Sequence, residues 1–203
     1  MFLKLDSYCK NLIKDFDLIS DERKEILTKI SNYIQKRKDK KLDINLIYIC
    51  THNSRRSHFG QVWSAVASEY YRIKNVFTFS GGTEATSFNK NAIQALKSTG
   101  FDIIKNDETS NPKYSVFFDE TKFINCFSKV YDDESNPKNY FAAIMTCSDA
   151  EVNCPFISGA ELRIGTTYND PKEYDETEFE AAKYLERSKQ IALETFFLFS
   201  LVK

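Results

Sequence analysis

One short segment of the chain, Cys50-Thr51-His52-Asn53-Ser54-Arg55-Arg56-Ser57, places an arginine six positions after a cysteine. A loop of this kind can trap an oxyanion, because its backbone amides and the guanidinium donate to the anion's oxygens while a thiolate acts as a nucleophile. A thiolate is favoured over a thiol where a helix begins, since that end of the helix carries partial positive charge. We therefore expect Cys50 to be a nucleophile and Arg56 to bind the anion. Ser57 would either cap the helix or donate to the thiolate.

The spacing alone is a weak signal, because a chain of this composition has roughly a one in six chance of containing it. The flanking sequence strengthens it. An apolar, β-branched run at 44–49 predicts a strand before the loop, and apolar residues at intervals of three and four predict a half-buried helix after it. The competing structural interpretation makes Cys50 a small buried hydrophobe and Arg56 a solvated cation. The residues expected to bind the anion are Thr51, His52, Asn53, Ser54, Arg55 and Arg56.

Two further cysteines, Cys147 and Cys154, lie seven residues apart in a polar loop after the apolar run 141–146. A metal site is disfavoured, because the only histidines are His52 and His58 and no further cysteine pair completes a tetrahedral set. A relay of thiols that exchange disulfides is the better interpretation. Two unreactive cysteines are the alternative.

A third signal is the carboxyl group of Asp170 in the segment Tyr168-Asn169-Asp170-Pro171. On its own, Asn-Asp-Pro is ordinary turn chemistry. Close to a thiolate and a bound oxyanion, however, the same carboxyl group would act as a general acid that protonates a leaving group.

The composition is that of an ordinary globular protein, with 203 residues, 42% hydrophobic and 28% charged. This length fits one domain with a full core. The net charge of -1 argues against a nucleic-acid surface. The chain has neither an export signal nor a run of eighteen apolar residues, so we expect a cytoplasmic protein without a membrane segment. Five cysteines in that setting argue against a structural disulfide framework.

The order of expected elements predicts a three-layer α/β fold with a central, mostly parallel four-stranded sheet. Its ligands should lie beyond the carboxyl ends of the strands. We expect a single domain over 1–203, made of a helical extension over 1–40 and a core over 44–203 with an inserted hairpin at about 105–125. The remaining expectations are a helix opening at Ser20, strands at 75–79 and 161–167, a turn at Ser80-Gly81-Gly82-Thr83, a helix from Asn89 to Ser98 and a closing helix capped by Thr177 and Glu180.

In chain order, these motifs resemble those of the thioredoxin-coupled arsenate reductases, which share their fold with the low-molecular-weight protein tyrosine phosphatases. The loop at Cys50 is similar to the family's Cys-x-x-Asn-x-x-Arg-Ser anion loop. The segment from Thr146 to Pro155 is similar to its redox loop, and Asn169-Asp170-Pro171 to its acid loop. The likeness covers about 44–104 and 126–200, and leaves the first 40 residues outside it.

The resemblance implies a sequence of thiol steps. Cys50 would attack arsenate held by the loop amides and Arg56, while Asp170 protonates the departing oxygen. Cys147 would then attack the arsenic adduct on Cys50 and release arsenite. Cys154 would resolve the resulting disulfide, and thioredoxin would be the electron donor. No bound cofactor is implied.

The resemblance also assigns supporting roles and exposes departures. Asn53 would brace the loop, and Ser57 would hydrogen-bond the thiolate. Arg55 stands where the family usually has a small residue or a cysteine, which adds positive charge beside the anion site. The helical extension and the insert exceed what the compact family needs, so they are expected to cover the site or to form a homodimer.

Two other functions remain open at this point. A phosphatase acting on phosphotyrosine or small phosphate esters would need only Cys50, Arg56 and Asp170, through a phosphocysteine intermediate that water hydrolyses. Cys147 and Cys154 would then be incidental or would protect against oxidation. A non-catalytic oxyanion sensor or adaptor would use the loop to bind an anion, and its function would survive the loss of Cys50.

Overall fold

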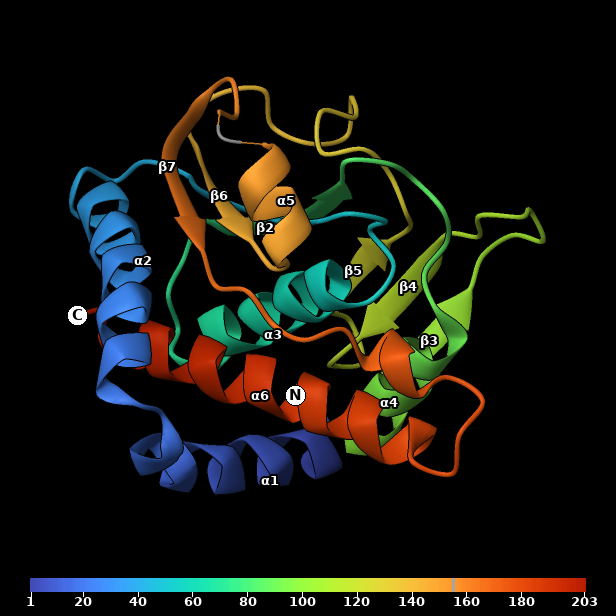
Figure 1. Cartoon of the computed structure of the whole chain (residues 1–203). Helices are drawn as coiled ribbons and strands as arrows, with labels where there is room; N and C mark the ends of the chain where they lie inside the picture. The colour runs from blue at the N-terminus through green and yellow to red at the C-terminus, as the bar shows by residue number, and fades with distance from the viewer. Residues whose placement is uncertain (155) are drawn as a thin grey trace.

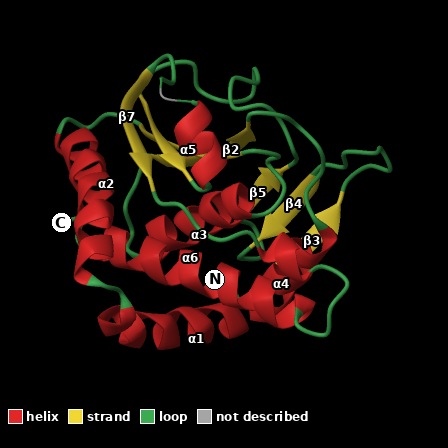
Figure 2. Ribbon diagram, viewed as in Figure 1, coloured by secondary structure: helices red, strands yellow, loops and turns green. Residues whose placement is uncertain are grey.

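The computed structural model describes residues 1–154 and 156–203, so Pro155, the last residue of the expected redox loop, lies outside the described residues. The centre of the fold is a four-stranded sheet in the order β2-β1-β6-β7 (Figures 1 and 2). Each neighbouring pair of strands is parallel, which confirms the expected parallel sheet. The strands are β1 (Ile44–Cys50), β2 (Val76–Gly82), β6 (Phe141–Met145) and β7 (Ala160–Gly165).

Helices cover the sheet on both faces, which explains the unbroken apolar run of β1. Because side chains alternate along a strand, Leu46 and Tyr48 enter the larger core, which also holds buried residues of helices α3 (Arg56–Tyr70) and α6 (Glu180–Ser200). Ile47 and Ile49 point to the other face and form a second cluster with Ala150 of the short helix α5 (Ser148–Asn153). β1 is therefore one of the two inner strands of a three-layer arrangement.

The amino-terminal extension is helical, as expected, and packs against the core. It consists of α1 (Leu3–Leu12), a 3-10 helix, η1 (Ile13–Leu18), and α2 (Asp21–Asp39), whose N-cap is Ser20. α1 lies along α6, on the side of α6 away from α3, and α2 crosses one end of α6 beside β7 (Figure 1). No helix in the described part of the chain is long and apolar enough to span a membrane.

The insert forms a small antiparallel sheet of its own. Strands β3 (Asp102–Lys105), β4 (Tyr114–Phe117) and β5 (Phe123–Cys126) pair in sequence order, so the expected hairpin is part of a three-stranded meander. Helix α4 (Lys90–Thr99) leads into this meander, with Asn89 as its N-cap.

Two local expectations were wrong. β2 does not end in a turn at Ser80 but continues to Gly82, which pairs with Cys50. Two glycines can remain in the strand because other backbone approaches closely here: a Cβ on Gly81 would lie 2.4 Å from the Tyr131 Cα. In addition, α6 begins after Phe179, and Thr177 is not its N-cap. The Thr177 hydroxyl belongs to the preceding turn, where it donates to the Tyr174 carbonyl at 2.7 Å.

Gly100 joins the end of α4 to the extension and gives a test of this packing. Its φ is 116°, a left-handed conformation, and a Cβ there would meet the Leu5 backbone nitrogen at 2.8 Å. We expect Gly100→Ala to lower the free energy of unfolding by about 1 to 3 kcal/mol, measured by urea denaturation. Gln94→Ala, at an exposed site of the same helix, should stay within about 0.5 kcal/mol of the wild type. Equal values for the two variants would contradict the close contact.

Candidate active site

The loop between β1 and α3 turns most of its carbonyl groups away from its interior. The carbonyl and amide of one planar peptide point in opposite directions, so the amides of 51, 52, 53 and 55 face the other way, as an anion site requires. In the described part of the chain, the amides of 52 to 55 donate no hydrogen bond. The outward bonds are Thr83 N to Cys50 O (3.1 Å), Glu84 N to Thr51 O (3.0 Å), Ser128 Oγ to His52 O (3.0 Å) and Asn89 N to Ser54 O (3.0 Å).

Asn53 braces the loop from within. Its φ of 45° lies in the left-handed region, which asparagine tolerates better than most residues. Its Nδ2 donates to Ser57 Oγ at 2.8 Å, and its Oδ1 accepts from the Lys129 amide at 2.9 Å. Ser57 Oγ in turn lies 3.1 Å from Cys50 Sγ. Because the Ser57 oxygen already accepts from Asn53, its hydroxyl proton can point at the Cys50 sulfur and stabilise a thiolate.

Arg56 ties the loop to the segment after β7. Its Nη1 donates to the Tyr168 carbonyl at 2.8 Å, and its Nη2 donates to Asp170 Oδ2 at 2.5 Å. The third face of the guanidinium carries Nε, which is buried and has no hydrogen-bond partner among the described residues. A buried donor without a partner is costly, so this N–H is suited to receive an anion. Arg56 and Asp170 therefore meet at one place, as the motifs require.

Arg55 points toward the acid loop, and its charge is balanced there. Its Nε donates to the Tyr184 hydroxyl at 2.8 Å, and its guanidinium lies 3.6 Å from Asp175 Oδ2 and 3.9 Å from Asp170 Oδ1. Burial raises the pKa of Tyr184 to about 12, so this phenol stays neutral and donates to Asp175 at 2.7 Å. Arg55 thus holds the segment 170–175 in place, and a direct role in binding the anion remains a prediction.

Cys147 lies beside the anion loop, at the carboxyl end of the strand next to β1. Its Sγ is 3.4 Å from Thr51 Oγ1 and accepts from the Ala150 amide at 3.4 Å, so it caps α5. Cys154 lies at the other end of α5 and is half-buried. At a rise of 1.5 Å per residue the two Cα atoms are about 10 Å apart, whereas a disulfide needs less than about 7 Å. α5 must partly unwind before these two thiols can join.

The remaining two cysteines, Cys9 and Cys126, are too deeply buried to take part in thiol exchange. Burial raises the pKa values of Cys9 and Cys126 to about 12, so both remain thiols at neutral pH. Among the described residues, no group of three or more His, Cys, Asp and Glu side chains could hold a metal ion. His52 lies at the exposed rim of the loop, with its Nε2 3.0 Å from Glu84 Oε1.

Several residues that shape the site were not predicted from the sequence. The Tyr168 carbonyl and the Lys129 amide act through the main chain, which leaves no signal in the side-chain pattern. Gly82 did leave a signal, the Gly-Gly pair that was taken for a turn. A Cβ on Gly82 would lie 2.5 Å from Thr51 O and 2.7 Å from Asn53 N, so the loop can lie against β2 only at a glycine.

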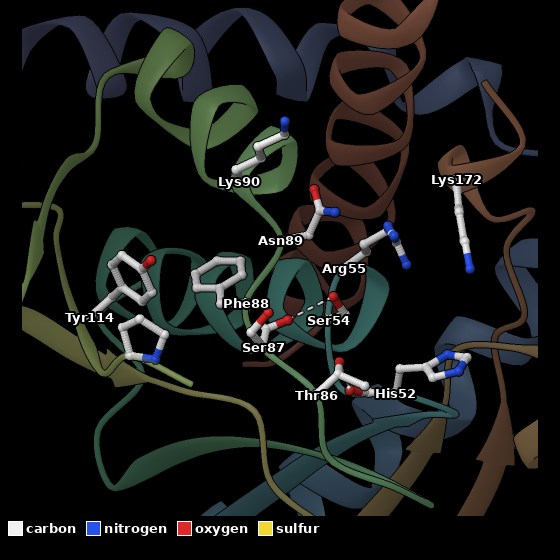
Figure 3. Close-up of a pocket in the computed structure, with 11 residues that line it drawn as sticks. His52, Ser54, Arg55, Thr86, Ser87, Phe88, Asn89, Lys90, Tyr114 and Lys172 are labelled. Carbon is white, nitrogen blue, oxygen red and sulfur yellow. Dashed lines mark hydrogen bonds between the residues drawn. The ribbon is translucent and has the colours of Figure 1, made fainter. Parts of the chain in front are cut away.

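A cavity of about 520 Å³ opens beside the carboxyl half of the loop (Figure 3). Ser54 and Arg55 form its inner wall, Phe88 and Tyr114 one side, and Lys172, which follows Pro171, another. Cys50 is not among its lining residues. The cavity therefore adjoins the anion loop and is larger than a single tetrahedral anion requires.

His58, in the first turn of α3, allows the burial behind the loop to be tested. Its Nδ1 lies 3.2 Å from Ser80 Oγ and its ring packs on Phe88. Burial, aided by the charge of Lys129, lowers the pKa of His58 to about 3. The unfolded state therefore takes up this proton first, and the stabilisation is complete above about pH 6.5 and lost as the pH falls toward 3.

From this shift we expect the unfolding free energy of the wild type to fall by about 2 kcal/mol more than that of His58→Gln between pH 7 and pH 5. Urea denaturation at the two pH values measures both. Equal losses in the two proteins would show that His58 is not held neutral by burial.

Comparisons with known proteins agree with the geometry. No protein-family model matches the chain. An arsenate reductase of Staphylococcus aureus is 26% identical over 152 residues, which cover 74% of this chain and 94% of that protein. Among solved structures, an arsenate reductase in a phosphate-binding state has a TM-score of 0.51 at 13% identity, covering 79% of this chain and 99% of that one.

A low-molecular-weight phosphotyrosine phosphatase of Vibrio cholerae has a TM-score of 0.50 at 15% identity, covering 77% of this chain and 95% of that one. At such identities the structural likeness concerns the fold alone. The sequence likeness, the fold and the loop with its bonded carbonyls point the same way. The chain is similar in sequence to arsenate reductases, and it shares the fold of the arsenate reductases and the low-molecular-weight protein tyrosine phosphatases.

Proposed function

We propose that the protein reduces arsenate to arsenite in the cytoplasm, using Cys50, Cys147 and Cys154 in turn and thioredoxin as the reductant. The observation that carries this proposal is the position of Cys147, whose sulfur contacts the Thr51 hydroxyl of the anion loop. A phosphatase needs no second thiol at that place, whereas reduction needs one within reach of the first adduct. The named activity of the curated relatives supports the same choice.

In the first step, the Cys50 thiolate attacks arsenic and one oxygen leaves as water. The loop amides and the free Nε of Arg56 hold the anion, and the Ser57 hydroxyl stabilises the thiolate beforehand. Asp170, which pairs with the Arg56 guanidinium, would in its protonated form donate a proton to the departing oxygen.

In the second step, the Cys147 sulfur attacks Cys50 and the bond between sulfur and arsenic breaks. The electron pair of that bond stays on arsenic, which leaves as arsenite. Two thiols have then been oxidised to one disulfide, and arsenic has gained two electrons. The two cysteines come from neighbouring strand ends. Ile49 and Met145 are partners in register, Cys50 follows Ile49, and Cys147 lies two residues beyond Met145, so the path of the attack is short.

In the third step, Cys154 attacks Cys147 and frees Cys50 for another cycle. The helical geometry requires α5 to unwind for this disulfide. Unwinding moves the pair away from the anion loop toward the surface, where Val152 and Phe156 are already exposed. A dithiol protein such as thioredoxin could then reduce it by exchange.

One observation favours a second candidate, the hydrolysis of phosphate monoesters. The cavity beside Ser54 and Arg55 could hold an organic group attached to the anion, with Phe88 and Tyr114 as apolar walls. In that function Cys50 would carry a phosphoryl group and water would remove it. Cys147 would be dispensable.

A turnover assay separates the candidates. We expect NADPH oxidation that depends on arsenate in the presence of thioredoxin and thioredoxin reductase, and we expect Cys147→Ser to lower its rate by at least about 10³-fold, since the second step then has no nucleophile. Cys9→Ala, which removes a buried cysteine outside the site, should retain the wild-type rate.

Hydrolysis of nitrophenyl phosphate by the same proteins is the control reaction. If arsenate is not turned over and ester hydrolysis survives Cys147→Ser, the protein is a phosphatase and not a reductase. If neither reaction occurs, the protein only binds oxyanions.

A further inference from the structure

We propose that the amino-terminal extension positions the anion-binding arginine, and that Arg23 of α2 is the residue through which it acts. This inference rests on the proposed function, because it assigns Arg23 to the support of Arg56 and Asp170. Arg23 does not touch the anion loop. It is a positioning residue that fixes the segment on which both site residues depend.

Arg23 leaves the first turn of α2 and reaches two groups of the core. Its Nε donates to Glu194 Oε2 at 2.8 Å, and its Nη2 lies 2.7 Å from the same oxygen. Nη2 also donates to the Thr166 carbonyl at 2.7 Å. A planar guanidinium that binds a carboxylate and a carbonyl together has little freedom to reorient. Through these bonds, the extension is joined to both α6 and the segment after β7.

Through Tyr168, the contacts of Arg23 and Glu194 reach the Arg56 side chain of the anion site. The Tyr168 hydroxyl donates to Glu194 Oε2 at 2.7 Å, and the Arg23 guanidinium lies over the Tyr168 ring, 4.7 Å from its centroid. The carbonyl of Tyr168 accepts from Arg56 Nη1 at 2.8 Å, and Asp170 follows two residues later. The segment 166–170 is therefore held on one side by Arg23 and Glu194, and on the other by Arg56.

Burial shows why this arrangement needs a cation from the extension. Glu194 is 4% exposed and Tyr168 is 7% exposed. Besides Arg23, this carboxylate accepts from two neutral side chains, the Tyr168 hydroxyl at 2.7 Å and the Gln190 amide at 3.2 Å. Among the described residues, Arg23 is the cation that pairs with Glu194. Without it a buried carboxylate would lack a counter-charge, and the segment would lose two contacts, the hydrogen bond to the Thr166 carbonyl and the cation over the Tyr168 ring.

The test measures anion binding without any reductase chemistry. Inorganic phosphate is titrated against the alkylation of Cys50 by iodoacetamide, and the Cys50 peptide is quantified by mass spectrometry. We expect Arg23→Met to raise the phosphate concentration for half-protection roughly tenfold, because small displacements of a binding group are costly. Arg23→Lys keeps the charge but loses the planar guanidinium with its several donors. Its phosphate concentration for half-protection should lie between those of Arg23→Met and the wild type.

The matched control is Lys29→Met, which removes a cation from an exposed position on the same helix and should leave protection unchanged. The melting temperature of each variant is recorded, and protection is measured well below it. The double variant Arg23→Met/Glu194→Gln removes the unpaired buried charge, so it guards against a failure to fold. It should still bind phosphate weakly, because the bond to the Thr166 carbonyl is absent.

Wild-type protection in both Arg23→Met and the double variant, whatever their melting temperatures, would make Arg23 a purely structural residue and overturn the inference. If phosphate fails to protect Cys50 in the wild type, the proposed function fails instead. The two failures are therefore distinguishable in one experiment.

Discussion

The amides of the loop after β1 can meet an anion only because the carbonyls of the same peptides are bonded elsewhere. This constraint explains residues that look unrelated in the sequence. Ser128 and Asn89 supply donors for the outward carbonyls, and Gly82 lets the loop lie against β2. Asn53 takes the left-handed conformation that the turn needs. The anion site is thus built as much by its outer side as by its inner one.

The parallel sheet supplies the second requirement, which is the gathering of distant groups. Strands β1, β6 and β7 are neighbours and run in the same direction, so the segments that follow them meet at one edge. Cys50, Cys147 and Asp170 reach that edge although Cys50 is far from the other two in the sequence. Arg56 links the first and last of these segments directly. A rigid sheet fixes the thiols' approach, while the short helix α5 is the part that must change.

The sequence was most informative where side-chain patterns control structure. The apolar run before Cys50 and the helical spacing after Arg56 predicted the strand, the loop and the helix, and the βα rhythm predicted the parallel sheet. Cys147 was expected near the loop because strand ends of a parallel sheet meet, and it lies there. These features depend on burial and periodicity, which a single sequence records.

Features that depend on main-chain contacts or on long-range polar contacts could not be predicted from the sequence. Nothing in the identity of Lys129 indicates that its amide binds Asn53. The direction of the Arg55 side chain was also not predictable. Its partners are Asp175 and Tyr184, and the packing of the start of α6 places both of them beside the anion loop. The same holds for Arg23, whose partner Glu194 is far along the chain. Long-range polar contacts leave no local pattern.

The proposed mechanism requires the Cys50 and Cys147 thiols to join across the anion loop. To test this, the Cys154→Ser variant is treated with one equivalent of arsenate and quenched with acid, and its disulfides are mapped by mass spectrometry. We expect a disulfide between Cys50 and Cys147 to accumulate together with one equivalent of arsenite. Free Cys147 after exposure to arsenate, with the arsenate unchanged, would rule the thiol relay out.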